Sequence, residues 1–347
     1  MKNGWLVAVG AVTSLSSAAH AQSSVTLYGI VDSYIALTHA SGKGTAVSLD
    51  GGGYSANRFG MRGTEDIGSG LAVNFQLENG FLSGTGALAD NTRFFSRQAW
   101  VGMSGAFGDV RAGRQNSPQF VMLAQLDAFY GATFASMLNN ASAYVPRYDN
   151  VIGYMSPSFA GFKVQGMVAP GGQADPHSGN NVYIAALEYA RGPIYAGVNH
   201  VEQRSQNAAF TIKSTFAGAN VDYGHGKVYA GFYRGNNNGS NAATNVQGRY
   251  FDIWSLSADW RISPAATAAI GGGFTDADGH GGPQAYEIGA AATYSLSKTT
   301  FLYSSVARLQ NRRGGTFSLA GAGPVSRNTP APGGTETGVQ IGIRHAF

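Results

Sequence analysis

The sequence predicts an all-β protein, a 16-stranded antiparallel transmembrane β-barrel, and three observations support this fold class. Charged residues make up only 12% of the 347 residues, about half of the usual ~25%. Glycine occupies 50 positions and aromatic residues make up 12% of the chain, which is typical of a β protein that meets an apolar medium on its outside. The chain also repeats a strand of about ten residues with alternating polarity, followed by a turn.

The amino-terminal segment has the pattern of a secretory signal peptide. Lys2 is followed by an apolar run over residues 5–15 and by Ala19-His20-Ala21, a small-residue cleavage site. We therefore expect a signal peptide over residues 1–21 and one barrel domain over residues 22–347. No later segment offers the ~20 apolar residues of a transmembrane helix, and without cysteine the chain forms no disulfide.

The alternation of side chains indicates lipid outside and water inside. In the first strand Val25, Leu27 and Val31 share one face, and Thr26 and Tyr28 share the other. The uniform face is the apolar one, whereas a soluble sandwich or barrel would place polar residues outside. Lipid around the barrel and water within it explain the pattern.

The spacing of the strands predicts sixteen of them. They begin near Ser24, Ser55, Gly70, Arg93, Gly108, Arg147, Gly161, Asn180, Pro193, Ala209, Lys227, Arg249, Pro264, Pro283, Lys298 and Thr335. Short and long connections alternate between them, and the first and third long connections cover residues 39–54 and 115–146. Outer-membrane barrels have this asymmetry, with short periplasmic turns and long external loops.

Six stretches of the chain resemble the general diffusion porins of Gram-negative outer membranes, in particular the trimeric betaproteobacterial type. They are residues 24–29 (SVTLYG), 58–66 (RFGMRGTED), 97–102 (RQAWVG), 113–115 (GRQ), 147–157 (RYDNVIGYMSP) and 343–347 (IRHAF). The resemblance implies a homotrimer in which each subunit has its own water-filled pore. It also implies that Phe347 is the carboxy-terminal signal read by the barrel-assembly machinery.

The resemblance further implies that the third long loop folds into the barrel. Between Arg114 and Arg147 the chain carries a single charge, Asp127, and many large apolar residues, which is unusual for a solvated loop. A loop packed against the inner wall would have this composition. A loop lying across a neighbouring subunit is the alternative.

The same resemblance implies a cluster of arginines on the wall opposite this loop. Matching the motifs gives Arg58, Arg97 and Arg147 as constriction residues. Arg62 shares a face with Arg58, because Phe59 and Met61 point the other way. Asp127 would face these cations across the gap, and Arg114 would instead support the trimer contact.

These features predict an outer-membrane porin, a passive and weakly anion-selective channel for small hydrophilic solutes. The alternatives are a substrate-specific channel for a sugar or phosphate and, less favoured, an outer-membrane barrel enzyme. No histidine is followed by glutamate, which excludes the His-Glu-x-x-His zinc pattern, and no nucleophile elbow is present. We expect no enzymatic activity, no cofactor or metal and no nucleic-acid partner; the expected partners are two further copies of the chain, outer-membrane lipid and lipopolysaccharide.

Overall fold

The computed structural model describes residues 24–141, 145–171, 179–205, 211–236, 250–277, 281–320 and 327–347. The predicted signal peptide lies outside these ranges and stays a prediction. Among the described residues no helix is long and apolar enough to cross a membrane.

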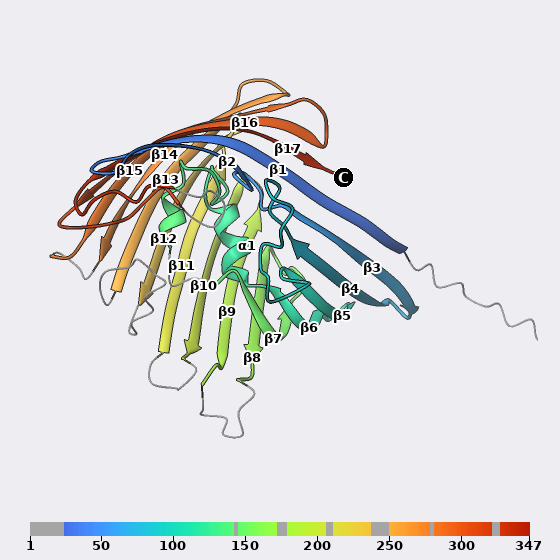
Figure 1. Cartoon of the computed structure of the whole chain (residues 1–347). Coiled ribbons are helices and arrows are strands. Elements are labelled where there is room, and N and C mark those ends of the chain that lie inside the picture. The colour runs from blue at the N-terminus through green and yellow to red at the C-terminus, as the bar shows by residue number, and fades with distance from the viewer. Residues whose placement is uncertain are drawn as a thin grey trace, which may run out of the picture.

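Within these ranges, seventeen strand segments form a single antiparallel sheet that closes on itself (Figure 1). They are β1 Ser24–Ala40, β2 Gly44–Gly51, β3 Arg58–Gly68, β4 Leu71–Gly80, β5 Gln98–Gly105, β6 Gly108–Asn116, β7 Arg147–Met155, β8 Phe162–Ala169, β9 Val182–Arg191, β10 Ile194–Arg204, β11 Thr211–Asp222, β12 Lys227–Asn236, β13 Tyr250–Arg261, β14 Ala266–Ala277, β15 Gln284–Ser295, β16 Thr300–Arg312 and β17 Thr335–Ala346.

The barrel has sixteen spanning strands, because β2 and β3 are two parts of one of them. Residues 33–40 of β1 pair with β2, and residues 24–30 of β1 pair with β3. The other edge of β1 pairs with β17, from Ile30↔Ala346 to Ala40↔Glu336, which closes the barrel. The predicted strand number and antiparallel closure are therefore confirmed.

The predicted long connection over residues 39–54 is wrong. β1 continues to Ala40, and β2 follows after a turn of three residues. The glycines in this stretch suggest a loop, but Val47 and Leu49 are 69% and 67% exposed and continue the apolar outer face. The chain instead leaves the wall over residues 52–57, starting at Gly52 with a φ of 85°.

The two faces of the wall differ as the alternation predicts. On β1 the outward Leu27 and Ile35 are 65% and 60% exposed, whereas the inward Tyr34 and Ala36 are 1% and 2% exposed. Exposed apolar side chains recur on the outer face all round the barrel. The buried hydrophobic core therefore lies inside the barrel, where the inner wall meets the third loop.

The third loop, residues 117–146, folds into the barrel as predicted. It carries the helix α1 (Pro118–Gln125), which Figure 1 shows enclosed by the strands, and the 3₁₀ turn η1 (Met137–Asn140). Ser117 caps α1 by accepting a hydrogen bond from Phe120 N, and Pro118 occupies the first turn, where no N–H is needed. The apolar residues of the loop form one cluster with inward residues from β1, β9 and β11–β16.

Hydrogen bonds to four wall strands fix the course of the loop. Gln119 Nε2 donates to Asn199 Oδ1 on β10 (2.8 Å), and Asn220 Nδ2 on β11 donates to Gln125 O (2.7 Å). Further along, Ala128 N donates to Ser257 Oγ on β13 (3.0 Å), and Phe134 N donates to Gln340 Oε1 on β17 (3.2 Å). The loop is thus attached along half of the inner circumference.

Inward-facing glycines of the wall make room for the side chains of this loop. We call them the glycine track: Gly197, Gly218, Gly271, Gly273, Gly289 and Gly338, on β10, β11, β14, β15 and β17. A Cβ built on any of them would come within 3.0 Å of a loop residue, for example 2.8 Å from Met122 Cε at Gly197. The loop can therefore lie close to the wall and leave the remaining cross-section open.

Candidate functional site

Arg58 and Arg62 project from β3 into the lumen. Phe59 and Met61, which lie between them in the sequence, are 40% and 37% exposed on the outer face. The two arginines therefore face the lumen, as the alternation predicts. Arg58 Nε donates to Ala56 O (3.0 Å), and the guanidinium carbon of Arg62 lies 5.5 Å from the ring centre of Tyr28. Both guanidinium groups thus start from wall positions opposite the third loop.

Arg97 is also in this region, but its charge is neutralised. Its Nε donates to Glu78 Oε1 at 2.6 Å, and both side chains are buried, with 7% and 2% exposed. Glu78 Oε2 accepts from Tyr28 OH (2.8 Å), which accepts in turn from Gln76 Nε2 (2.5 Å). The sequence analysis did not identify Glu78 as the partner of Arg97.

Arg147 lies where the third loop rejoins the wall. It is the first residue of β7 and pairs in register with Asn116, the last residue of β6. Its guanidinium carbon lies 5.0 Å from the ring centre of Phe120 on α1. Arg147 therefore lies beside α1, at the point where the third loop ends and β7 begins.

The position of Asp127 differs from the expected one. Its carboxylate is 2% exposed and accepts hydrogen bonds from Ser136 Oγ (2.6 Å) and Gly131 N (2.9 Å) within the loop. Its other oxygen accepts from Ser257 Oγ of β13 (3.3 Å). Burial raises the pKa of Asp127. The side chain thus holds the loop together and does not point across the gap at the arginines, because unpaired carboxylates are costly to bury and these donors are at hand.

The structure adds Arg344 to the predicted cations. It is an inward residue of β17, a cross-strand neighbour of Asp32 and Phe301, and its guanidinium carbon lies 5.3 Å from the Phe301 ring centre. Arg344 and Arg97 are the two cations that act electrostatically on Arg58. The alternation of polar and apolar residues in the carboxy-terminal strand was the sequence signal that could have placed Arg344 on the inner face.

The charges on this part of the wall leave a positive excess. Arg97 pairs with Glu78, and Arg111 pairs with Asp109 at 2.7 Å. Within the described ranges, Arg58, Arg62 and Arg344 form no salt bridge. These three guanidinium groups remain charged at any physiological pH, so the wall facing the loop carries a fixed positive charge.

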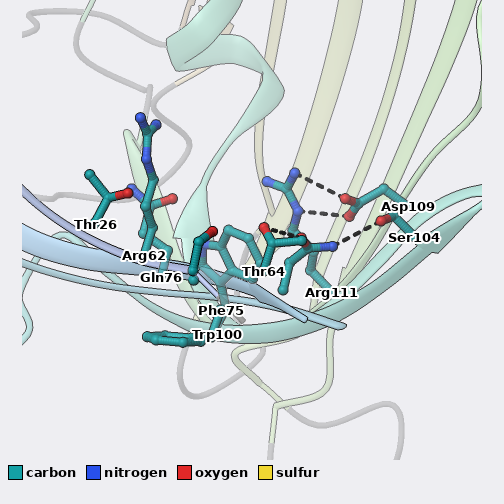
Figure 2. Close-up of a pocket in the computed structure, with 12 residues that line it drawn as sticks. Thr26, Arg62, Thr64, Phe75, Gln76, Trp100, Ser104, Asp109 and Arg111 are labelled. Atoms are coloured by element: carbon teal, nitrogen blue, oxygen red, sulfur yellow. Dashed lines mark hydrogen bonds and ion pairs between the residues drawn. The ribbon is translucent and has the colours of Figure 1, made fainter. Parts of the chain in front are cut away.

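Polar side chains of β1 and β3–β6 line a hollow of about 380 Å³ beside Arg62. Figure 2 shows Arg62 and Arg111 projecting to the same side of these strands, with Asp109 bonded to Arg111. Arg111 lies over the Trp100 ring, 4.2 Å from its centre. No group of three histidine, aspartate or glutamate side chains able to hold a metal occurs in the described part of the chain. The hollow is thus a charged and polar part of the inner wall.

Comparison with known proteins gives the family. The sequence model of the Gram-negative porins matches residues 6–314. The chain belongs to the Gram-negative porin family. This porin is 30% identical to outer membrane porin protein 32 of Delftia acidovorans, over 97% of this chain and 98% of the relative. It is also 33% identical to a major outer membrane protein P.IB of Neisseria gonorrhoeae over 53% of each chain.

Solved structures agree with the barrel described above. The anion-selective porin from Comamonas acidovorans superimposes with a TM-score of 0.80 at 27% identity, covering 94% of this porin and 100% of that chain. The Salmonella typhi OmpF complex with daunomycin superimposes with a TM-score of 0.67 at 14% identity, covering 93% and 97%, which shows the fold alone. The protein is thus an outer-membrane porin, a passive channel formed by a multi-strand barrel.

Proposed function

We propose that this porin is weakly anion-selective and carries small hydrophilic solutes and ions without a chemical step. The supporting observation is a set of three arginines, Arg58, Arg62 and Arg344, on the wall opposite the third loop, which form no salt bridge with any residue that the structure describes. Arg97 and Arg147 complete the constriction, Arg97 with its charge offset by Glu78. The name of the Comamonas acidovorans relative, an anion-selective porin, agrees with this proposal.

The Coulomb energy between two charges sets the size of the expected selectivity. Two unit charges 4 Å apart interact by about 1 kcal/mol in water and by ~4 kcal/mol at an effective dielectric of 20. A wet constriction lies nearer the first value, so one uncompensated arginine biases permeating ions by about 1 kcal/mol, a factor of about five. Salt weakens the bias, because the Debye length falls from ~10 Å at 0.1 M to ~3 Å at 1 M.

Reversal potentials in planar bilayers test this proposal. Across a tenfold KCl gradient, the wild type should prefer chloride at low salt and lose part of that preference at high salt. The double variant Arg58→Ser and Arg62→Ser should shift the reversal potential toward potassium and raise the conductance. Arg234→Ser is the matched control, because Arg234 is 59% exposed and pairs with Asp252 on the outer face.

An unchanged reversal potential in the double variant would contradict the assignment of these arginines. A shift of equal size in the Arg234 control would also contradict it, because that charge lies outside the pore. The expected result separates charges in the lumen from charges elsewhere on the barrel.

We also propose that the protein is a homotrimer in contact with outer-membrane lipid and lipopolysaccharide. The family resemblance supports the trimer, as does a charged network beside the third loop. Arg93 and Arg114 share Asp149, at 3.0 and 2.6 Å, and all three side chains are partly exposed. Cross-linking in mild detergent should give trimers; a monomer at all protein concentrations would contradict the proposal.

The two ends of the chain have roles in export and assembly under this proposal. Cleavage near Ala21 releases the mature chain, and Phe347 engages the barrel-assembly machinery. The amino-terminal sequence of the protein purified from outer membranes tests the first statement. A retained segment 1–21 would contradict it.

A further inference from the structure

A short segment of the wall enters the lumen and brings an aromatic side chain with it. Between β2 and β3, residues 52–57 are fixed on Asp32, whose Oδ2 accepts from Tyr54 N (3.0 Å) and Ser55 N (2.7 Å). Asn57 Oδ1 in turn accepts from Asp32 N (2.5 Å). Tyr54 is therefore held rigidly inside the barrel by its own backbone.

The third loop presents a second tyrosine to Tyr54. The ring centres of Tyr54 and Tyr130 are 5.8 Å apart. Tyr130 has a φ of 58°, a conformation that bulky residues rarely adopt, and its side chain is 50% exposed. On the wall side, Tyr54 packs on Phe301 (4.9 Å, 76°) and Tyr303 (5.4 Å, 51°). The four rings form an aromatic bridge between the wall and the loop, with the Tyr130 ring open to the lumen.

A cation that forms no salt bridge within the described residues adjoins this bridge. Arg344 lies over Phe301, and its Nε is buried with no hydrogen-bond partner among the described residues. Asp32, its cross-strand neighbour, has both oxygens occupied, because Oδ1 accepts from Tyr303 OH (2.6 Å) and Oδ2 from the two backbone N–H groups.

A second carboxylate near the bridge, Asp259, is also engaged. It accepts from Tyr229 OH (2.5 Å) and Lys227 N (3.2 Å). Neither carboxylate accepts a hydrogen bond from Arg344 within the described residues, so the guanidinium keeps donors for an anion.

We propose that Tyr54, Tyr130, Phe301 and Arg344 form a binding site in the lumen for planar aromatic monocarboxylates. This inference rests on the proposed anion preference and adds a ligand class to it. A benzoate-like ligand can set its ring against Tyr130 in an offset or edge-on contact while its carboxylate accepts from the Arg344 guanidinium. An aliphatic acid has only the second contact and a neutral aromatic only the first.

Competition between matched acids tests the site. Chloride current through the wild-type trimer is recorded while benzoate or cyclohexanecarboxylate, which has the same charge and a saturated ring, is added. Benzoate should block at a concentration two- to tenfold lower, the range that aromatic pairing gives. Equal block by the two acids overturns the site.

Variants locate the site within the pore. Tyr130→Leu should remove the difference between the two acids and keep the anion preference, whereas Tyr130→Phe should retain the difference. Arg344→Gln should weaken block by both acids. Tyr183→Leu is the matched control, because Tyr183 is also 50% exposed but lies on the outer face of β9.

The outcomes separate this inference from the proposed function. A chloride-preferring channel that treats both acids alike overturns only the aromatic site. A channel that prefers potassium, or that does not conduct, overturns the proposed function and the site with it. If Tyr130→Leu does not assemble, Tyr54→Leu is expected to give the same loss of discrimination, and a retained difference there contradicts the proposal.

Discussion

Glu78 and Arg97 illustrate how one buried residue changes the electrostatic role of another. Arg97 sits beside the pore, yet at 7% side-chain exposure and 2.6 Å from Glu78 it contributes little net charge to the lumen. Glu78 also accepts from Tyr28, so a single carboxylate orders three strands. Breaking a buried pair leaves an uncompensated charge, which is strongly destabilising.

We expect Glu78→Gln to lower stability and to increase anion preference together. The substitution leaves the Arg97 guanidinium buried without its counter-charge, at a cost of about 3–5 kcal/mol. Thermal unfolding in detergent measures the first effect, and the reversal potential measures the second. Arg62→Gln is the control, because the Arg62 side chain is exposed and outside any salt bridge with a described residue; it should lower anion preference with little loss of stability. Unchanged stability of Glu78→Gln would contradict the role of the pair.

Asp127 gives a prediction for the pH dependence of stability. Burial raises its pKa in the folded protein, so the folded state favours the protonated carboxyl. That contribution is fully present below the unfolded pKa of about 3.9 and is lost as the pH rises through the folded value. The wild type should therefore lose stability relative to Asp127→Asn between acid and neutral pH. The amide oxygen can accept from Gly131 N and Ser136 Oγ while its NH₂ donates to Ser257 Oγ.

Melting temperatures of the two proteins from pH 4 to pH 8 check this expectation. Asp90→Asn is the control of opposite sign, because hydrogen bonds from Thr92 lower the pKa of the partly exposed Asp90 to about 2. Its contribution is present above about pH 3.9 and is lost only as the pH falls toward 2. Parallel curves for the wild type and Asp127→Asn would refute the burial argument.

At the scale of elements, the position of the third loop depends on the absence of side chains at the glycines of the wall. Its apolar residues are buried because the glycine track offers space and because β10, β11, β13 and β17 supply hydrogen-bond partners. The loop then needs few charges of its own, which explains why Asp127 is its only one. The position of the loop inside the barrel is therefore set jointly by loop and wall.

Gly289→Ala should push the third loop toward the lumen. The new Cβ would lie 2.5 Å from Ala135 Cβ and 2.6 Å from its Cα, so backbone has to move, at a cost of about 1–3 kcal/mol. Single-channel conductance should fall or become noisier. Gly166→Ala is the control, because its nearest contact is 4.0 Å away. Identical conductance in both variants would mean that the loop does not rest on Gly289.

At the scale of the whole molecule, closure of the barrel joins the two ends of the chain. Gly29 N donates to Phe347 O (3.0 Å), and Phe347 N donates to Gly29 O (3.1 Å). A Cβ on Gly29 would collide with the Phe347 ring, so glycine at this position seats the last residue against the first strand. Closure pairs both edges of β1 and of β17, so neither end of the sheet presents an open edge to lipid.

Deletion of Phe347 should reduce the amount of assembled barrel and leave the conductance of surviving channels unchanged, because the residue lies outside the lumen at the closing seam. Quantification of the protein in outer-membrane fractions, together with single-channel recording, tests both parts. Phe347→Tyr keeps an aromatic ring and should assemble as the wild type does. Normal assembly of the deletion would remove the assigned role of Phe347.

The amino-acid sequence alone determined the architecture of this protein. Fourteen of the sixteen strands begin within three residues of their predicted starts. The second begins at Gly44 instead of near Ser55, and the fourth begins at Gln98, five residues after Arg93. Alternation is a local property with a period of two residues, and it survives whatever neighbour each strand has. The family resemblance implied the inward course of the third loop, and its apolar composition agreed with that course.

Only the tertiary structure decided which charges remain free in the lumen. The pairing of Arg97 with Glu78, the burial of Asp127 and the inward turn that positions Tyr54 depend on contacts between residues 19, 130 and 271 positions apart in the sequence. The alternation along a strand determines whether a side chain faces the lumen, but it does not determine which other side chain it contacts there. The physical reason is that the free-energy cost of burying a charge depends on which donors and acceptors surround it. Those groups come together only when the barrel has closed.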